Sequence, residues 1–241
     1  MSSCSYFIYT GTNDIPPHTT HLRTSPDFND VIVLPTTITH LIFGKCYNQP
    51  YTTLPPNLVS LFFGETYNQP IAQLPDSLEE LIFCCDYNQQ TILPPNLKYL
   101  SLGYHYNKPI VLPPKLLRLH FSEMYNQPTV LPDSIEHVSF GKMYNQQTIL
   151  PDSTKILVFG KMYNQPIVLP PFVVQLFFGN MYNQLTILPQ SIKHLTFGKM
   201  YDQLTTLPQQ LDYICLPKGY HHPIDLPHSL SHFGVFGSFN V

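Results

Sequence analysis

The chain has 241 residues, of which only 11% are charged, and its formal net charge is −3. This weak charge, without a long run of like charges, argues against nucleic acid or a charged membrane surface as a partner. No apolar stretch reaches the roughly 18 residues that a membrane-spanning helix needs, so we expect no membrane span.

The cysteines are odd in number and show neither paired nor metal-ligand spacing. We therefore expect free thiols, a reducing cytoplasmic setting, and no bound metal or cofactor. The segment from Met1 to Gly11 has no basic region and too short an apolar run for a secretion signal. The five cysteines are Cys4, Cys46, Cys84, Cys85 and Cys215.

One pattern recurs every 19 or 20 residues, close to Tyr-Asn-Gln-Pro-Ile-x-Leu-Pro-x-Ser-Leu-x-x-Leu-x-Phe-Gly-x-x. Such a short fixed period is typical of a solenoid, in which one small unit stacks on copies of itself. We expect residues 1–14 to form an N-terminal cap segment, and residues 15–241 to form one solenoid of about 11–12 repeats, the last one partial. The tyrosine column of the repeat is Tyr47, Tyr67, Tyr87, Tyr106, Tyr125, Tyr144, Tyr163, Tyr182, Tyr201 and Tyr220.

Each repeat contains a short segment that alternates as a β-strand does. In residues 40–43, Leu41 and Phe43 share one face of an extended chain, whereas His40 and Ile42 share the other. The Leu and Phe positions recur in most repeats, which predicts a buried pair on each strand. Stacked copies should form one parallel sheet with strands about 4.8 Å apart.

The rest of each repeat is a return segment that contains Leu-Pro, often followed by a second proline, as in Pro55-Pro56. Proline removes a backbone donor and favours extended geometry in the preceding residue, which argues against a regular helix. We expect extended and turn backbone there, hence a mainly β solenoid with few or no helices. A glycine follows most strands. Pro217 stands in the same column, and proline cannot adopt a positive φ. We therefore expect that the glycine is needed because there is no room for a side chain.

An asparagine follows the tyrosine in most repeats, as in Tyr67-Asn68 and Tyr163-Asn164. A polar residue that recurs beside buried aromatic rings must be hydrogen-bonded, so we expect an asparagine ladder that satisfies turn amides and carbonyls. The tyrosine hydroxyls likewise need partners or a path to water. We interpret both columns as structural.

The segment from Phe63 to Ile71, with Tyr67-Asn68-Gln69-Pro70 inside it, resembles the FNIP repeat, which is also described by its FGxxFN motif. This family is a branch of the leucine-rich repeats, abundant in social amoebae and giant viruses, and the resemblance runs from about Phe28 to Asn240. It implies a curved leucine-rich-repeat-like array with a parallel concave β-sheet, two stacked aromatic spines and a role in protein–protein interaction. A viral member would work in the host cytoplasm.

This chain differs from the family pattern in having a shorter repeat and tyrosine in place of phenylalanine in nearly every motif. Many members carry an F-box ahead of the repeats and would recruit targets to a ubiquitin ligase. About 14 residues precede Ile15-Pro16 here, too few for an F-box. One alternative function is therefore a ubiquitin-ligase-associated substrate adapter that lacks its own F-box.

The outward strand positions vary most between repeats, and solenoids use such surfaces to bind partners. They form two apolar patches with a polar stretch between them, so we expect a protein partner on the concave face. The alternatives are that these side chains pack as cross-strand ladders within the sheet, or that the chain's own termini fill this face. The residues expected to bind are Ile42, Phe62, Ile82, Tyr99, Arg118, His120, His137, Val158, Phe177, His194 and Tyr213.

Histidines in neighbouring strands raise the question of a metal site, namely His21 with His40 and His120 with His137. A zinc site needs three or four convergent ligands, and no carboxylate or thiol in the column pattern completes either pair. We therefore predict no metal site.

His120, Ser139 and Glu136 carry the residue types of a catalytic triad, but a triad is recognised by geometry and these positions lie on an open sheet. We therefore predict no catalytic residues and a non-enzymatic interaction scaffold. A second hypothesis is a self-assembling, dimeric or larger, structural protein. The sequence ends at Phe239-Asn240-Val241, midway through a repeat, and an uncapped solenoid end favours pairing with another copy.

Overall fold

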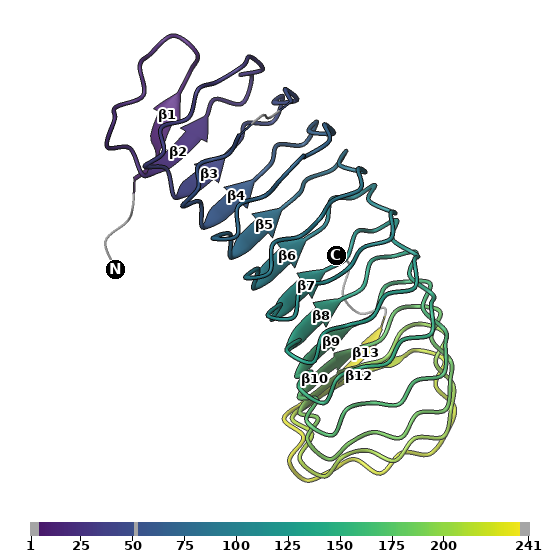
Figure 1. Cartoon of the computed structure of the whole chain (residues 1–241). Helices are drawn as coiled ribbons and strands as arrows, with labels where there is room; N and C mark the ends of the chain where they lie inside the picture. The colour runs from purple at the N-terminus through teal and green to yellow at the C-terminus, as the bar shows by residue number, and fades with distance from the viewer. Residues whose placement is uncertain (1–4, 51–52, 237–241) are drawn as a thin grey trace. The chain divides into compact units, whose positions relative to one another are not determined.

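The computed structural model describes residues 5–50 and 53–236. Within these ranges the chain forms short β-strands and no helix, and each strand is followed by a return segment without regular secondary structure (Figure 1). The chain divides into two compact units, Met1–Leu116 and Leu117–Val241. The strands are β1 (Phe7–Tyr9), β2 (His21–Thr24), β3 (His40–Ile42), β4 (Ser60–Phe62), β5 (Glu80–Ile82), β6 (Tyr99–Ser101), β7 (Arg118–His120), β8 (His137–Ser139), β9 (Ile156–Val158), β10 (Gln175–Phe177), β11 (His194–Thr196), β12 (Tyr213–Pro217) and β13 (His232–Phe236).

In the first unit, β1 to β6 lie side by side in chain order and every pair is parallel. The register advances by one repeat at each step, so Leu22 lies beside Leu41 and Leu41 beside Leu61. The segment expected to form a cap contributes β1, which pairs with β2 through Phe7 and Leu22. The predicted parallel stacking of repeats is confirmed.

The second unit repeats this arrangement from β7 to β13, again parallel and in chain order. Val138 lies beside Leu157, and Leu157 lies beside Leu176. The second residue of each of these strands is fully or almost fully buried, except Phe233 near the end of the described chain, which is about half exposed. The buried pair predicted from the sequence is therefore present, because Phe159 and its equivalents are buried as well.

The phenylalanines and tyrosines stack in two interior spines. In the second unit the ring centroids of Phe159 and Phe178 are 5.5 Å apart, and those of Tyr163 and Tyr182 are 6.1 Å apart, with the planes nearly parallel. Within one repeat, Phe178 lies against Tyr182 at 3.8 Å. Because such contacts add about 0.5–1.5 kcal/mol per pair beyond area burial, the spines are a large part of the core energy.

The glycine that follows most strands packs closely against the preceding turn. A Cβ atom on Gly160 would lie 1.8 Å from the carbonyl oxygen of Gly141, and one on Gly179 would lie 1.8 Å from that of Gly160. Of the glycines in the described residues, only Gly11 has a positive φ. Lack of room, rather than backbone handedness, thus explains this column, as expected.

The asparagine ladder is also confirmed. The Oδ1 atom of Asn164 accepts the backbone N–H of Asn183 at 2.9 Å and the side-chain amide of Gln184 at 3.2 Å. The Gln184 amide also donates to the backbone carbonyl of Asn164 at 3.2 Å. We predicted no role for this glutamine, but its side chain connects its own turn to the preceding turn by hydrogen bonds.

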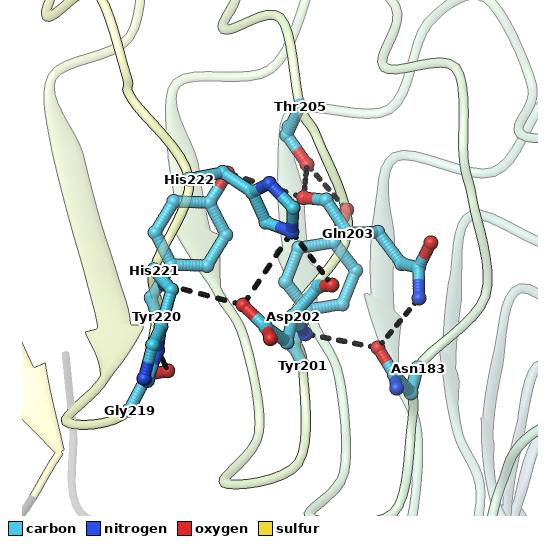
Figure 2. Close-up of polar contacts among 9 residues, drawn as sticks. All are labelled: Asn183, Tyr201, Asp202, Gln203, Thr205, Gly219, Tyr220, His221 and His222. Atoms are coloured by element: carbon cyan, nitrogen blue, oxygen red, sulfur yellow. Dashed lines mark hydrogen bonds and ion pairs between the residues drawn. The ribbon is translucent and has the colours of Figure 1, made fainter.

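The ladder continues where Asp202 replaces asparagine in this column, as Figure 2 shows. The backbone N–H of Asp202 donates to Asn183 Oδ1 at 2.9 Å, and Asp202 Oδ1 accepts the N–H of His221 at 3.1 Å. His222 lies against the same carboxylate, with its Nε2 atom 3.6 Å from Asp202 Oδ1. An aspartate can therefore replace the asparagine as acceptor.

Most tyrosine hydroxyls of the column fall into two classes according to the residue four positions later; Tyr220 is an exception, because it is followed by Ile224 but donates to the Gln203 carbonyl at 3.1 Å. Thr186 Oγ1 donates to the Gln184 carbonyl at 3.0 Å, so it accepts a hydrogen bond from Tyr182. Where isoleucine replaces this threonine, at Ile167, the buried hydroxyl of Tyr163 has no hydrogen-bond partner in the described structure. The tyrosine–threonine pairs are Tyr87–Thr91, Tyr125–Thr129, Tyr144–Thr148, Tyr182–Thr186 and Tyr201–Thr205.

We predict opposite effects of removing the hydroxyl in these two classes. Tyr163→Phe should raise the free energy of unfolding by up to about 1 kcal/mol, because it removes a buried polar group that forms no hydrogen bond. Tyr182→Phe should lower it by about 1 kcal/mol, because it removes a formed hydrogen bond. Urea unfolding followed by circular dichroism measures both changes. Equal changes in the two variants would contradict the assignment.

We predict that Asn164→Ala lowers the free energy of unfolding by about 1–3 kcal/mol, because the amides of Asn183 and Gln184 lose their acceptor. Asn164→Asp is the matched variant and should cost clearly less, since Asp202 already serves as an acceptor in this column. Chemical denaturation of the two variants compares them. The prediction is wrong if the alanine and aspartate variants are equally stable.

We predict that the fold loses stability at alkaline pH. Burial raises the pKa of Tyr87 and of Tyr182 to about 12, with the hydrogen bonds to Thr91 and Thr186 opposing this rise. An unfolded tyrosine ionises near pH 10, so the folded-state pKa is the higher one. The stabilisation is therefore complete below about pH 10 and is lost as the pH rises from about 10 to about 12. A free energy of unfolding that stays constant across this window would refute the expectation.

Candidate interaction surface

From β2 to β13, the first and third residues of each strand point away from the core and form what we call the sheet face. In β1 the outward residue is Ile8, which lies beside Arg23 and is 58% exposed. In the first unit the strand register places Ile42 beside Phe62 and Phe62 beside Ile82, so the first predicted patch is assembled. All three side chains are half-buried. This burial agrees in part with the alternative interpretation, in which neighbouring strands cover one another's side chains.

The neighbouring column of the first unit is polar. The imidazole rings of His21 and His40 stack with centroids 4.2 Å apart and planes 6° from parallel. Ser60 donates a hydrogen bond to the carboxylate of Glu80 at 2.9 Å, and Tyr99 lies beside Glu80 on the next strand. Burial lowers the pKa of His40, the positive charge of His21 lowers it further, and Glu80 opposes both effects. The His40 imidazole is therefore mostly neutral near pH 7.

In the second unit the predicted polar stretch begins on β7 and β8. Arg118 and His120 are exposed, and the register places Arg118 beside the half-buried His137. Partial burial lowers the pKa of His120, as do the positive charges of Arg118 and His137. Arg118 is thus the permanent positive charge among these three predicted residues.

The second apolar patch leads into an aromatic hollow. Val158 lies beside Phe177 on β9 and β10, and His194 lies beside Tyr213 on β11 and β12. The rings of His194 and Tyr213 meet edge to face, with centroids 6.2 Å apart. A hollow of about 370 Å³ opens among these strands, and its lining residues are Phe177, His194, Thr196, Asp212, Tyr213, Ser231 and His232.

The hydroxyl of Tyr213, one of the lining residues, is hydrogen-bonded to the thiol of Cys215. A Cβ atom on Gly234 would lie 3.5 Å from the Cys215 sulfur and 3.7 Å from the Tyr213 hydroxyl. Both distances are ordinary van der Waals contacts, so this position has room for a Cβ atom. Burial and the neighbouring Cys215 raise the pKa of Tyr213, and burial raises that of the Cys215 thiol, so both groups are protonated at neutral pH.

Four lining residues of the hollow were not among the predicted site residues, namely Thr196, Asp212, Ser231 and His232. The Ser231 hydroxyl lies 2.9 Å from Nδ1 of His232. Thr39 and His40 form the same contact at 2.9 Å. A hydroxyl residue directly before a strand histidine is therefore the sequence signal that could have drawn attention to His232.

The residues considered for catalysis and metal binding take other roles. His120 and Ser139 are register neighbours, but the Glu136 carboxylate pairs with Lys155 at 2.8 Å, and this contact lowers its pKa. Within residues 5–50 and 53–236, no three His, Cys, Asp or Glu side chains are grouped so that they could hold a metal ion. Cys46, Cys84, Cys85 and Cys215 are free thiols. No described segment forms a helix that could cross a membrane.

Comparison with protein-family models identifies the FNIP Repeat in residues 11–46, 47–86, 87–124, 144–181 and 182–219. The chain therefore belongs to the FNIP repeat family, in agreement with the resemblance seen in the sequence. None of the curated proteins compared with the chain matches it.

Among solved structures, the chain is similar to CroV588 from a giant virus, described as a novel circular LRR protein, with 27% identity and a TM-score of 0.64. The match covers 92% of this chain and 50% of CroV588, so this chain spans about half the length of that protein. It is also similar to YopM from Yersinia enterocolitica, at 18% identity, a TM-score of 0.57 and coverage of 92% and 52%. A third match is YopM of Yersinia pestis, a leucine-rich effector protein, at 21% identity, a TM-score of 0.54 and coverage of 92% and 67%. These likenesses confirm a leucine-rich-repeat-like solenoid with a parallel sheet.

Proposed function

We propose that the chain is a non-enzymatic scaffold that binds a protein partner through its sheet face. The observation that carries this proposal is the aromatic hollow of the second unit, bounded by Phe177, His194 and Tyr213. Leucine-rich-repeat-like folds typically serve as interaction scaffolds, which supports the general class of function.

The chemistry of the hollow suits a protein hot spot. Tyr213 is 36% exposed and offers an apolar ring with a polar tip, the combination favoured at binding surfaces. Phe177 is half-buried, so it supplies an apolar base at little entropic cost, while Asp212 and Thr196 supply a polar border. We expect a partner segment that inserts an apolar side chain and hydrogen-bonds at the rim.

The other predicted residues extend this surface. Arg118, His120 and His137 lie on β7 and β8 of the same unit and would select a partner with acidic or hydrogen-bonding groups. The patch of Ile42, Phe62 and Ile82, with Tyr99 farther along, gives the first unit its own apolar contact area.

The proposed compartment is the cytoplasm, or the host cytoplasm for a viral protein, in keeping with the free thiols. The segment that motivated self-assembly through solenoid ends, Phe239-Asn240-Val241, lies outside the described residues. An adapter role remains a hypothesis from the family resemblance alone.

We predict that Phe177→Ala and Tyr213→Ala each remove the proteins that the immobilised wild-type chain captures from native-cell extract, because each substitution takes away an aromatic contact of the hollow. Quantitative mass spectrometry of the captured proteins is the measurement. Phe172→Ala is the matched control, since Phe172 lies outside the strands of the same unit and is 65% exposed.

Circular dichroism should show that all three variants keep the β fold. Recovery of the same proteins by the Phe177→Ala and Tyr213→Ala variants would show that this face is not the binding surface. Equal loss in the Phe172→Ala variant would show that capture depends on the other side of the solenoid.

A further inference from the structure

Four β-branched apolar residues stand almost fully exposed on consecutive return segments of the second unit. They occupy the position before Leu-Pro in their repeats, and we call them the return stripe: Val130, Ile149, Val168 and Ile187. Their exposed fractions are 88%, 90%, 89% and 91%. Large aliphatic side chains exposed to this degree in a row indicate a surface that is covered in the working protein.

The surroundings of the return stripe are grooved and carry few charges, with Asp152 lining one of the hollows. No charged residue occurs within two positions of any stripe residue. A hollow of about 720 Å³ lies between Ile149 and Val168, and another of about 420 Å³ lies between Val168 and Ile187. Exposed side chains thus alternate with apolar depressions at the period of the repeat.

Backbone preference alone does not explain these residues. A β-branched residue suits the extended geometry that precedes Leu-Pro, but threonine meets this requirement as well as valine does. Thr53 and Thr206 occupy the same repeat position elsewhere in the chain. The fold therefore accepts a polar residue here, and the unbroken apolar run at this position from Ile92 to Ile187 needs another reason.

We propose that the return stripe is the interface between two copies of this chain, arranged antiparallel about a twofold axis between Ile149 and Val168. The stripe residues recur at the spacing of the repeats, and a second copy presents that same spacing. The axis places Val130 beside Ile187 of the partner subunit and Ile149 beside Val168 of the partner subunit. Every contact then joins one valine to one isoleucine, and Asp152, which lines the hollow between Ile149 and Val168, is the charged residue nearest the axis.

The available area is sufficient for such a dimer. Leu185 and Leu204, which are 71% and 62% exposed, flank the stripe at its C-terminal end. With them, each copy presents about 800 Å² of accessible aliphatic surface, close to what one partner buries in a standard-size interface. The stripe lies on return segments, so the dimer leaves the strand positions of the sheet face free in both copies.

Sedimentation of the whole chain over a range of concentrations tests the proposal. The wild-type chain should form dimers, and Ile149→Thr/Val168→Thr should weaken dimerisation by at least about tenfold, because threonine keeps the β-branch and removes the apolar contact. Val33→Thr is the matched control, since Val33 is 87% exposed at the same repeat position of the first unit.

Two results would overturn the proposal: a wild-type chain that stays monomeric at every concentration, or a dimer that the double threonine variant forms equally well. Phe177→Ala should leave dimerisation unchanged, which separates this interface from the proposed binding face. A loss of dimers in the Phe177→Ala variant alone would assign the contact to the sheet face instead.

Cysteine cross-linking tests the antiparallel arrangement. Chains carrying Ile149→Cys, mixed with chains carrying Val168→Cys, should form a disulfide-linked dimer under mild oxidation, whereas either variant alone should cross-link no more than the wild type. The wild-type chain supplies the background, because Cys85 is an exposed native thiol. Cross-linking of the Ile149→Cys variant by itself would reject this arrangement.

Discussion

The hydrogen bonds from each asparagine side chain to the next turn are the interaction on which this structure depends. The strands supply backbone pairing for only a few residues in each repeat, and the return segments have no regular pairing of their own. Buried backbone groups outside the strands must still find partners. Asn164 meets this need by accepting from Asn183 and Gln184 at once, and the same pattern recurs in both units.

This ladder holds neighbouring turns in the same register in repeats of both 19 and 20 residues, and the aromatic spines depend on that register. Rings stack only when each turn places them above the rings of the preceding turn, as Tyr163 and Tyr182 do at 6.1 Å. The close approach at Gly160 reflects the same requirement, because even one Cβ atom would push neighbouring turns apart. Tyrosine in the spine adds a cost that phenylalanine does not have. The hydrogen bond to threonine offsets this cost in repeats such as that of Tyr182 and Thr186. At Tyr163 the buried hydroxyl has no partner in the described structure, so the cost remains.

The interior residues are nearly the same in every repeat, so the repeats differ mainly on two outer surfaces, the sheet face and the return segments. The sheet face carries aromatic, polar and charged side chains in adjacent strands, which suits selective recognition of a partner. The return stripe carries the same two residue types in alternation, which suits contact with a copy of itself. If both proposals hold, each dimer presents two sheet faces, and a partner with two binding segments would gain affinity through linkage rather than through new contacts.

The sequence by itself determined the repeat period, the strand positions, the parallel order and the buried columns. Each of these follows from local periodicity, and Leu41 with Phe43 was enough to orient every strand. The tertiary structure decided which side chains are exposed. The predicted residues Ile42, Phe62 and Ile82 proved half-buried, whereas Ile149 and Ile187 proved about nine-tenths exposed. The reason is that exposure depends on how closely the adjacent turns approach, and strands paired at hydrogen-bonding distance cover their neighbours more than the return segments do.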